Sequence, residues 1–79
     1  EGANLEGANL EAANLWYTSL GGANLEGANL QGANLTDAYL TDANLLEADF
    51  TGANIGGAMM IRAQFCNTKM PWGLENKDC

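Results

Sequence analysis

The stretch EGANL-EGANL-EAANL, residues 1–15, writes one five-residue unit three times. The unit continues with substitutions as far as Phe65. Within it, alanine stands in the third place, asparagine in the fourth and an apolar residue in the fifth. The fifth-place residues are Leu5, Leu10, Leu15, Leu20, Leu25, Leu30, Leu35, Leu40, Leu45, Phe50, Ile55, Met60 and Phe65. This period decides the fold, and it says much more about shape than about activity.

A period of five suits neither of the regular secondary structures. Residues five apart on a helix differ by about 140°, so the leucines would scatter around it. On a long strand, successive leucines would alternate between the two faces. The period instead predicts a chain that turns a corner every five residues, so that four units make one coil and coils stack about 4.8 Å apart. Leucine and alanine then point inward, asparagine points outward, and the second-place glycine suits a positive φ.

Residues twenty apart are therefore expected to stack on the same side of the tower. The interior columns are Leu5–Leu25–Leu45–Phe65, Leu10–Leu30–Phe50, Leu15–Leu35–Ile55 and Leu20–Leu40–Met60. Outside, stacked asparagines such as Asn14, Asn34 and Asn54 are expected to form amide ladders. The same register predicts surface ion pairs, Asp42 with Arg62 and Asp49 with Lys69, and a like-charge stack of Glu6 and Glu26.

The repeated pattern resembles that of the pentapeptide repeat family, usually written A-(N/D)-L-x-x, over residues 1–65. The resemblance implies an all-β fold, a right-handed quadrilateral β-helix. Thirteen units make about three coils. We expect two parts: the β-helix over 1–65 and a short C-terminal capping tail over 66–79.

Composition excludes several classes of function. The chain has 79 residues, enough for one small domain, and its net charge is −7. Such a charge argues against direct binding of nucleic acid. There is no histidine, phosphate-binding loop or nucleophile elbow, so we expect no enzyme, cofactor or metal site. No apolar run approaches the roughly 18 residues of a membrane span. Because the repeat is already under way at Glu1, we interpret the chain as a mature or excised fragment.

The first break in the repeat is Trp16-Tyr17-Thr18-Ser19. Here Thr18 replaces the inward alanine, and two aromatic residues take outward positions. Tyr39 should lie directly above Ser19, with Met59 above it. These outward residues are a candidate patch for a protein partner, because exposed aromatic side chains mark interfaces: Trp16, Tyr17, Tyr39 and Met59. The alternative is tolerated surface variation, with the aromatic rings lying flat on the ladder.

The second break is the tail after Phe65. The exposed end of a solenoid needs a cap. We expect Met70 to extend the core, Pro71 and Gly73 to bracket Trp72 in a turn, and Trp72 with Leu74 to lie over the end as a lid.

The two cysteines, Cys66 and Cys79, bracket this tail. An even pair around a loop predicts a disulfide, which would contribute about 3 kcal/mol and indicate an oxidising compartment. The alternative is two free thiols in a cytoplasmic protein.

The tail resembles that of cyanobacterial and plant pentapeptide repeat proteins of the thylakoid lumen or periplasm. The residues that carry this likeness are Cys66, Thr68, Met70, Pro71, Gly73 and Cys79. Two functional hypotheses follow. The first is a structural scaffold that docks an unidentified protein partner, in the thylakoid lumen or periplasm. The second is a DNA mimic acting on DNA gyrase, which the family resemblance and the acidic charge suggest. The disulfide, the short tower and the absence of a helical dimer module argue against the second.

Overall fold

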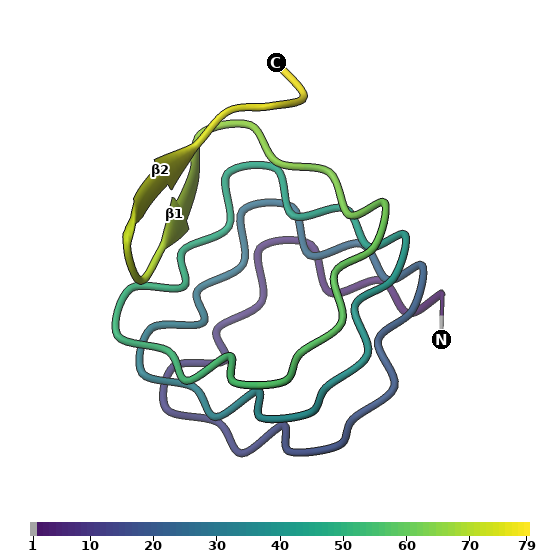
Figure 1. Cartoon of the computed structure of the whole chain (residues 1–79), viewed down its shortest axis with the longest axis vertical. Helices are drawn as coiled ribbons and strands as arrows, with labels where there is room; N and C mark the ends of the chain where they lie inside the picture. Colours follow the sequence, from purple (N-terminus) through teal and green to yellow (C-terminus); the bar gives the residue numbers. More distant parts are fainter. Residues whose placement is uncertain (1) are drawn as a thin grey trace.

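The computed structural model describes residues 2–79, and its backbone winds in stacked turns about one axis (Figure 1). Each turn pairs with the next through parallel bridges between residues twenty apart. The bridges form four columns: Asn4–Asn24–Asn44–Gln64, Asn9–Asn29–Asp49–Lys69, Asn14–Asn34–Asn54 and Ser19–Tyr39–Met59. The twenty-residue register predicted from the period is therefore confirmed.

Within residues 2–79, only two segments form strands longer than a single bridged residue. Strand β1, Thr68–Met70, pairs antiparallel with β2, Gly73–Glu75, and the turn between them lies at Pro71 and Trp72. Because Lys69 also bridges Asp49, β1 continues one column of the tower and β2 adds a reversed layer beyond it. In Figure 1 this hairpin stands at the rim of the coils. Residues 2–79 contain no helix of the length and apolarity that crossing a membrane requires.

The core consists of the third-place and fifth-place side chains. From Leu20 to Ala53 they are almost wholly buried, and those from Ala23 to Ala48, which have neighbours in the coils on both sides, are 0–1% exposed. The fifth-place residues nearer the two ends are only partly buried, since each lacks a neighbour on one side: Leu5, Leu10, Leu15, Ile55 and Met60. Leucine and alanine therefore point inward, as the sequence predicts.

The corner of every unit is made at its second place, where the backbone has a positive φ. At Gly57 this φ is 72°, and a side chain there would also collide with the carboxylate of Asp37. The same conformation is held by residues with side chains, among them Tyr17 at 63° and Glu47 at 59°. Non-glycine residues rarely adopt it, so the surrounding ladders impose it on them.

Four of the five amides in a typical unit donate to backbone oxygens. In the unit ending at Leu30, the Gly27 N–H donates to the Leu46 carbonyl in the next coil at 2.9 Å, and the Leu30 N–H donates to the Asp49 carbonyl at 2.7 Å. The Ala28 N–H closes the corner on the Leu25 carbonyl at 3.0 Å, and the Asn29 N–H donates to the Ala8 carbonyl in the preceding coil at 2.8 Å.

The fifth amide, at the first place, has no backbone acceptor and depends on the preceding asparagine. The Glu6 N–H donates to Asn4 Oδ1 at 3.2 Å, and the Thr36 N–H donates to Asn34 Oδ1 at 3.1 Å. This corrects the predicted role of asparagine. Its side chain closes a local turn two residues long, and only Asn44 Nδ2 with Asn24 Oδ1, at 3.3 Å, forms a ladder bond between coils within the described chain.

Candidate functional site

One side of the tower carries the residues that break the repeat. Tyr39 bridges Ser19 below and Met59 above, as predicted. Trp16 and Tyr17 form the corner just before Ser19, and their rings meet edge to face with centroids 4.8 Å apart. All four large side chains are exposed. This surface, made by residues 16–22, 36–42 and 56–62, is the Tyr39 face.

Sequence reasoning missed one member of this face, Ile61. Its side chain is 56% exposed at the corner that follows Met59. The signal was available, because Ile61 lies forty residues above Gly21 in the same register. With Ile61 included, the Tyr39 face holds five of the seven large apolar side chains that are exposed within residues 2–79; the other two are Trp72 and Leu74.

The same face leaves three backbone amides without an acceptor. At its fourth places Ser19, Tyr39 and Met59 replace asparagine, so no amide oxygen is available for the residue two positions later. Within residues 2–79, no hydrogen bond is donated by the N–H groups of Gly21, Thr41 and Ile61.

Other first-place residues in the described chain have an acceptor or need none. From Glu6 to Gly56 they donate to the Asn or Asp that lies two residues earlier, at 3.0–3.2 Å. The Cys66 N–H donates to Thr68 Oγ1 at 3.1 Å, and Pro71 has no N–H to satisfy. Three unpaired donors therefore lie in one column, at a single corner of the tower.

A shallow open depression lies at this corner. It is lined by Gly2, Gly21, Gly22, Thr41 and Asp42. Because the glycines have no side chains, the backbone forms much of its surface. The lining includes two of the three residues with unpaired amides, Gly21 and Thr41.

Charge on the Tyr39 face is set by two aspartates and one arginine. Arg62 donates to both carboxylate oxygens of Asp42, at 2.8 and 3.2 Å, which confirms the ion pair predicted from the register. The hydrogen bond from Arg62 lowers the pKa of Asp42, and the same bond raises the pKa of Arg62. The carboxylate of Asp37 lies against the backbone of Gly57. Asp42 and Arg62 thus offset each other, and Asp37 leaves the face with one net negative charge.

The second predicted ion pair, Asp49 with Lys69, is not among the salt bridges of the described chain. The two residues do stack. Asp49 instead accepts hydrogen bonds from the Thr51 hydroxyl and from Gln31 Nε2, each at 2.6 Å. The Thr51 hydroxyl is the main cause of the lowered pKa of Asp49. Asp49 therefore bonds to Thr51, two residues away in the sequence, and forms no ion pair with Lys69 in the coil above.

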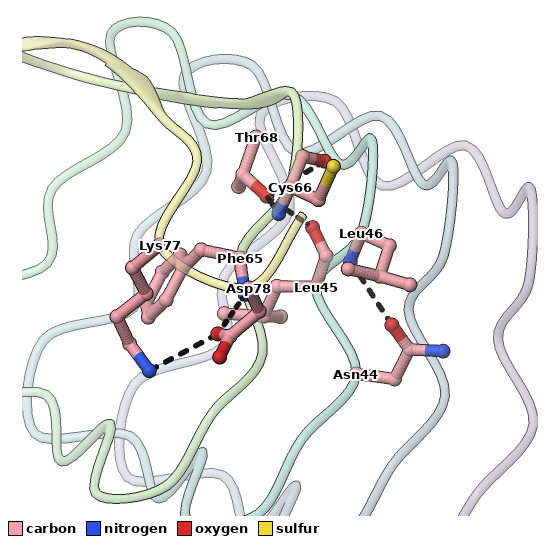
Figure 2. A network of polar contacts seen from close by, with 8 residues as sticks. All are labelled: Asn44, Leu45, Leu46, Phe65, Cys66, Thr68, Lys77 and Asp78. Atoms are coloured by element: carbon pink, nitrogen blue, oxygen red, sulfur yellow. Dashed lines mark hydrogen bonds and ion pairs between the residues drawn. The ribbon is translucent and has the colours of Figure 1, made fainter.

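The C-terminal segment is held by the predicted disulfide between Cys66 and Cys79. It folds back over Phe65, where the Phe65 N–H donates to Asp78 Oδ2 and the Asp78 N–H donates to the Phe65 carbonyl, both at 2.8 Å (Figure 2). The Asn67 N–H donates to Asn76 Oδ1 at 2.7 Å. The side-chain oxygens of Asp78 and Asn76 accept the hydrogen bonds that the backbone carbonyls of a further coil would accept. The bond from Phe65 is the main cause of the lowered pKa of Asp78, with a smaller contribution from Lys77.

The structure corrects the predicted lid. Trp72 and Leu74 are 65% and 56% exposed, so their side chains lie mostly in solvent and not over the end of the core. The Trp72 indole N–H donates to Glu75 Oε2 at 2.9 Å, which holds the ring on its own hairpin. Lys77 Nζ lies 5.7 Å from the centre of the Phe65 ring, which places residues 77 and 78 over that ring. Met70 is buried as predicted, and Thr68, also buried, donates to the Leu45 carbonyl at 2.7 Å.

Residues 2–79 contain no group of three or more His, Cys, Asp or Glu residues placed to hold a metal ion. The chemistry that the Tyr39 face offers is recognition: aromatic and aliphatic surface, backbone donors and carboxylates.

These features define a class of protein, the solenoids built from five-residue units. The model for pentapeptide repeats matches residues 3–42 and 33–70, in eight copies. The chain therefore belongs to the pentapeptide repeat family, whose fold is a right-handed quadrilateral β-helix.

Solved structures of pentapeptide repeat proteins resemble the chain. HetL, involved in heterocyst differentiation regulation in the cyanobacterium Nostoc sp. strain PCC 7120, is 38% identical with a TM-score of 0.89; the match covers 91% of this chain and 34% of HetL. The chain thus spans about a third of HetL. A protein from the Arabidopsis thaliana thylakoid lumen is 33% identical, with a TM-score of 0.48 and coverage of 78% of this chain and 46% of that protein. No curated protein matches the chain.

Proposed function

We propose that this chain is a non-enzymatic scaffold module that docks a protein partner on the Tyr39 face. The observation that carries the proposal is the gathering of five of the seven exposed large apolar side chains on one side of the tower. Scattered apolar side chains are normal on a protein surface, whereas a contiguous set marks an interaction site. Tryptophan and tyrosine also dominate the binding energy of known interfaces.

The test is the double variant Trp16→Ala/Tyr39→Ala. Partners of the wild-type chain are first identified by crosslinking in its native host and then purified, and binding is measured by calorimetry. We expect the double variant to weaken binding at least tenfold, because hot-spot truncations cost about 2 kcal/mol or more. The matched control is Trp72→Ala/Leu74→Ala, which removes the other two exposed apolar side chains and should bind normally. Unchanged binding by the Trp16→Ala/Tyr39→Ala variant would exclude the Tyr39 face as the docking site.

DNA mimicry toward gyrase is the alternative that the net charge of −7 favours. It predicts inhibition of gyrase supercoiling, or protection of gyrase from quinolones, by the purified chain. Absence of both effects at high molar excess would dismiss this alternative.

We also propose that residues 2–65 form the repetitive part of about three coils and that residues 66–79 act as its C-terminal cap. The support is chemical. Asp78 and Asn76 supply side-chain oxygens to the amides of Phe65 and Asn67, which would otherwise face solvent at the end of the ladder. Deleting residues 76–79 should increase amide exchange at Phe65 and leave exchange at Leu30 unchanged. Equal exchange at Phe65 in both forms would refute the cap.

The compartment we propose is oxidising and extracytoplasmic, in the thylakoid lumen or the periplasm. The disulfide supports it, because such bonds persist mainly outside the reducing cytoplasm. Alkylation of the chain in intact cells, before lysis, should find no titratable thiol. Two titratable thiols would favour the cytoplasm.

A further inference from the structure

The Tyr39 face differs from the other three sides in its backbone as well as its side chains. Along the other sides, the oxygen of a fourth-place Asn or Asp accepts from the first-place amide that follows it, as at Glu26 and Leu46. Only on the Tyr39 face do three successive coils lack this acceptor, and the amides of Gly21, Thr41 and Ile61 stay unpaired within residues 2–79. A backbone N–H is a strong donor, and stability favours giving it a partner.

The unpaired donors lie where a ligand has room. Gly21 and Thr41 line the shallow depression at this corner, and its glycines leave the backbone open to an approaching chain. Tyr39 and Met59, both exposed, lie on the adjoining flat side. An apolar surface beside a row of backbone donors fits an extended peptide, whose carbonyl oxygens accept and whose side chains pack.

Charge selects among peptides. Asp42 and Arg62 of this face pair with each other, so the carboxylate of Asp37 supplies its net negative charge. The two lysines of the chain lie elsewhere, Lys69 on β1 and Lys77 over Phe65. The edge-to-face pair of Trp16 and Tyr17 leaves both side chains exposed to a cation. A basic segment is therefore complementary to the face, and an acidic one is repelled.

We propose that the Tyr39 face binds an extended, basic segment of its partner protein. Carbonyl oxygens of the segment accept hydrogen bonds from the N–H groups of Gly21, Thr41 or Ile61. Apolar side chains of the segment pack on Tyr39 and Met59, and a lysine or arginine lies against Trp16 and Tyr17. This inference rests on the proposed scaffold role and names the chemistry of the partner.

The probe is the peptide acetyl-(Leu-Arg)₃-amide, titrated into the full chain and followed by NMR. We expect the amide signals of Gly21, Thr41 and Ile61 to shift and their hydrogen exchange to slow, while the amides of Glu26 and Leu46 serve as paired controls. The Trp16 indole signal should shift and the Trp72 indole signal should not, because Trp72 is held on the distant hairpin. The same peptide with citrulline in place of arginine keeps the shape without the charge, and should bind roughly fivefold more weakly or worse.

Two variants separate the donors from the rings. Ser19→Asn supplies the missing side-chain acceptor to the Gly21 amide and leaves every aromatic residue in place. It should weaken peptide binding roughly 2- to 12-fold while the chain becomes no less stable to urea. Tyr39→Leu removes a ring and leaves the donors, so the shift of the Gly21 amide should persist at weaker affinity. Trp72→Leu is the matched control and should bind as the wild type does.

Four results would overturn the inference. These are equal shifts at Trp16 and Trp72, unmoved amides at Gly21, Thr41 and Ile61, equal affinity for the citrulline peptide, or unaltered affinity in Ser19→Asn. If one of them occurs while Trp16→Ala/Tyr39→Ala still abolishes docking of the native partner, the scaffold role stands and only the basic, extended character of the segment is wrong. If the peptide binds as expected but docking of the native partner survives the double variant, the scaffold role fails alone.

Discussion

Two neighbouring sides of this tower, the Asn14–Asn34–Asn54 column and the Ser19–Tyr39–Met59 column, share one core and differ on the outside. Behind both, the fifth-place leucines of the middle coil are fully buried. On the first side, each asparagine accepts the amide two residues later; on the second, the corresponding amides have no partner in the described chain.

The difference shows where this protein gives up stability. Replacing asparagine by serine, tyrosine and methionine removes a hydrogen bond from each coil and exposes large apolar surface. Neither change improves the fold. Both are understandable if the surface is kept for binding, since sites of function often violate the local rules that the rest of a protein obeys.

The largest expected effect tests whether the core is the same behind both sides. Leu35→Ala and Leu40→Ala each truncate a fully buried side chain, and each should lower the free energy of unfolding by about 2–5 kcal/mol. Urea denaturation measures both. A Leu40→Ala variant that proves much milder than Leu35→Ala would mean that the interior behind the Tyr39 face is looser, and the contrast would no longer be confined to the surface.

Removing the disulfide should give the next largest loss of stability. The double variant Cys66→Ser/Cys79→Ser opens a loop with a sequence separation of 13 and should lower stability by about 3 kcal/mol. Amide exchange should rise first at Phe65 and Asn67, whose side-chain acceptors lie in the tail. Uniform destabilisation from Leu25 to Phe65 would show that the tail and the tower unfold as one unit.

Substitutions at the fourth place should change stability by a smaller amount, lowering it on the Asn14–Asn34–Asn54 side and raising it on the Tyr39 face. Asn34→Ala leaves the partly buried Thr36 amide unpaired and should cost about 1 kcal/mol. Tyr39→Asn offers an acceptor to the Thr41 amide and should raise stability by about 0.5–1.5 kcal/mol. Thermal unfolding together with amide exchange at Thr36 and Thr41 checks both. A destabilised Tyr39→Asn variant would contradict the idea that this side forgoes stability.

The smallest effect depends on pH and concerns the tail. The Phe65 amide lowers the pKa of Asp78 below its ordinary value of 3.8, so its carboxylate contributes stability above that value. The contribution is lost as pH falls below 3.8 through the lower pKa of the folded state. An Asp78→Asn variant should therefore show a flatter stability profile between about pH 2 and pH 5. Identical profiles for the two proteins would remove Asp78 from its capping role.

Much of this could be read from the period of five. It predicted the inward alanines and leucines, the stacking of residues twenty apart, and the Asp42–Arg62 pair, because each depends only on register. The disulfide followed from two cysteines that bracket the tail. The role of asparagine was misjudged, since its side chain reaches an amide two residues away before it reaches the next coil. The lid was misjudged because Trp72 lies on a hairpin that carries it away from the core.

The sequence by itself determined which residues lie inside and which stand above one another, since a strict repeat in a closed coil leaves no freedom in register. Only the tertiary structure decided which backbone amides find an acceptor. Hydrogen bonds depend on the directions and distances of individual groups, and a repeat pattern does not specify these. The unpaired amides of Gly21, Thr41 and Ile61 are the consequence, and they turn a surface that the sequence marked only as aromatic into one with a definite chemistry for a partner.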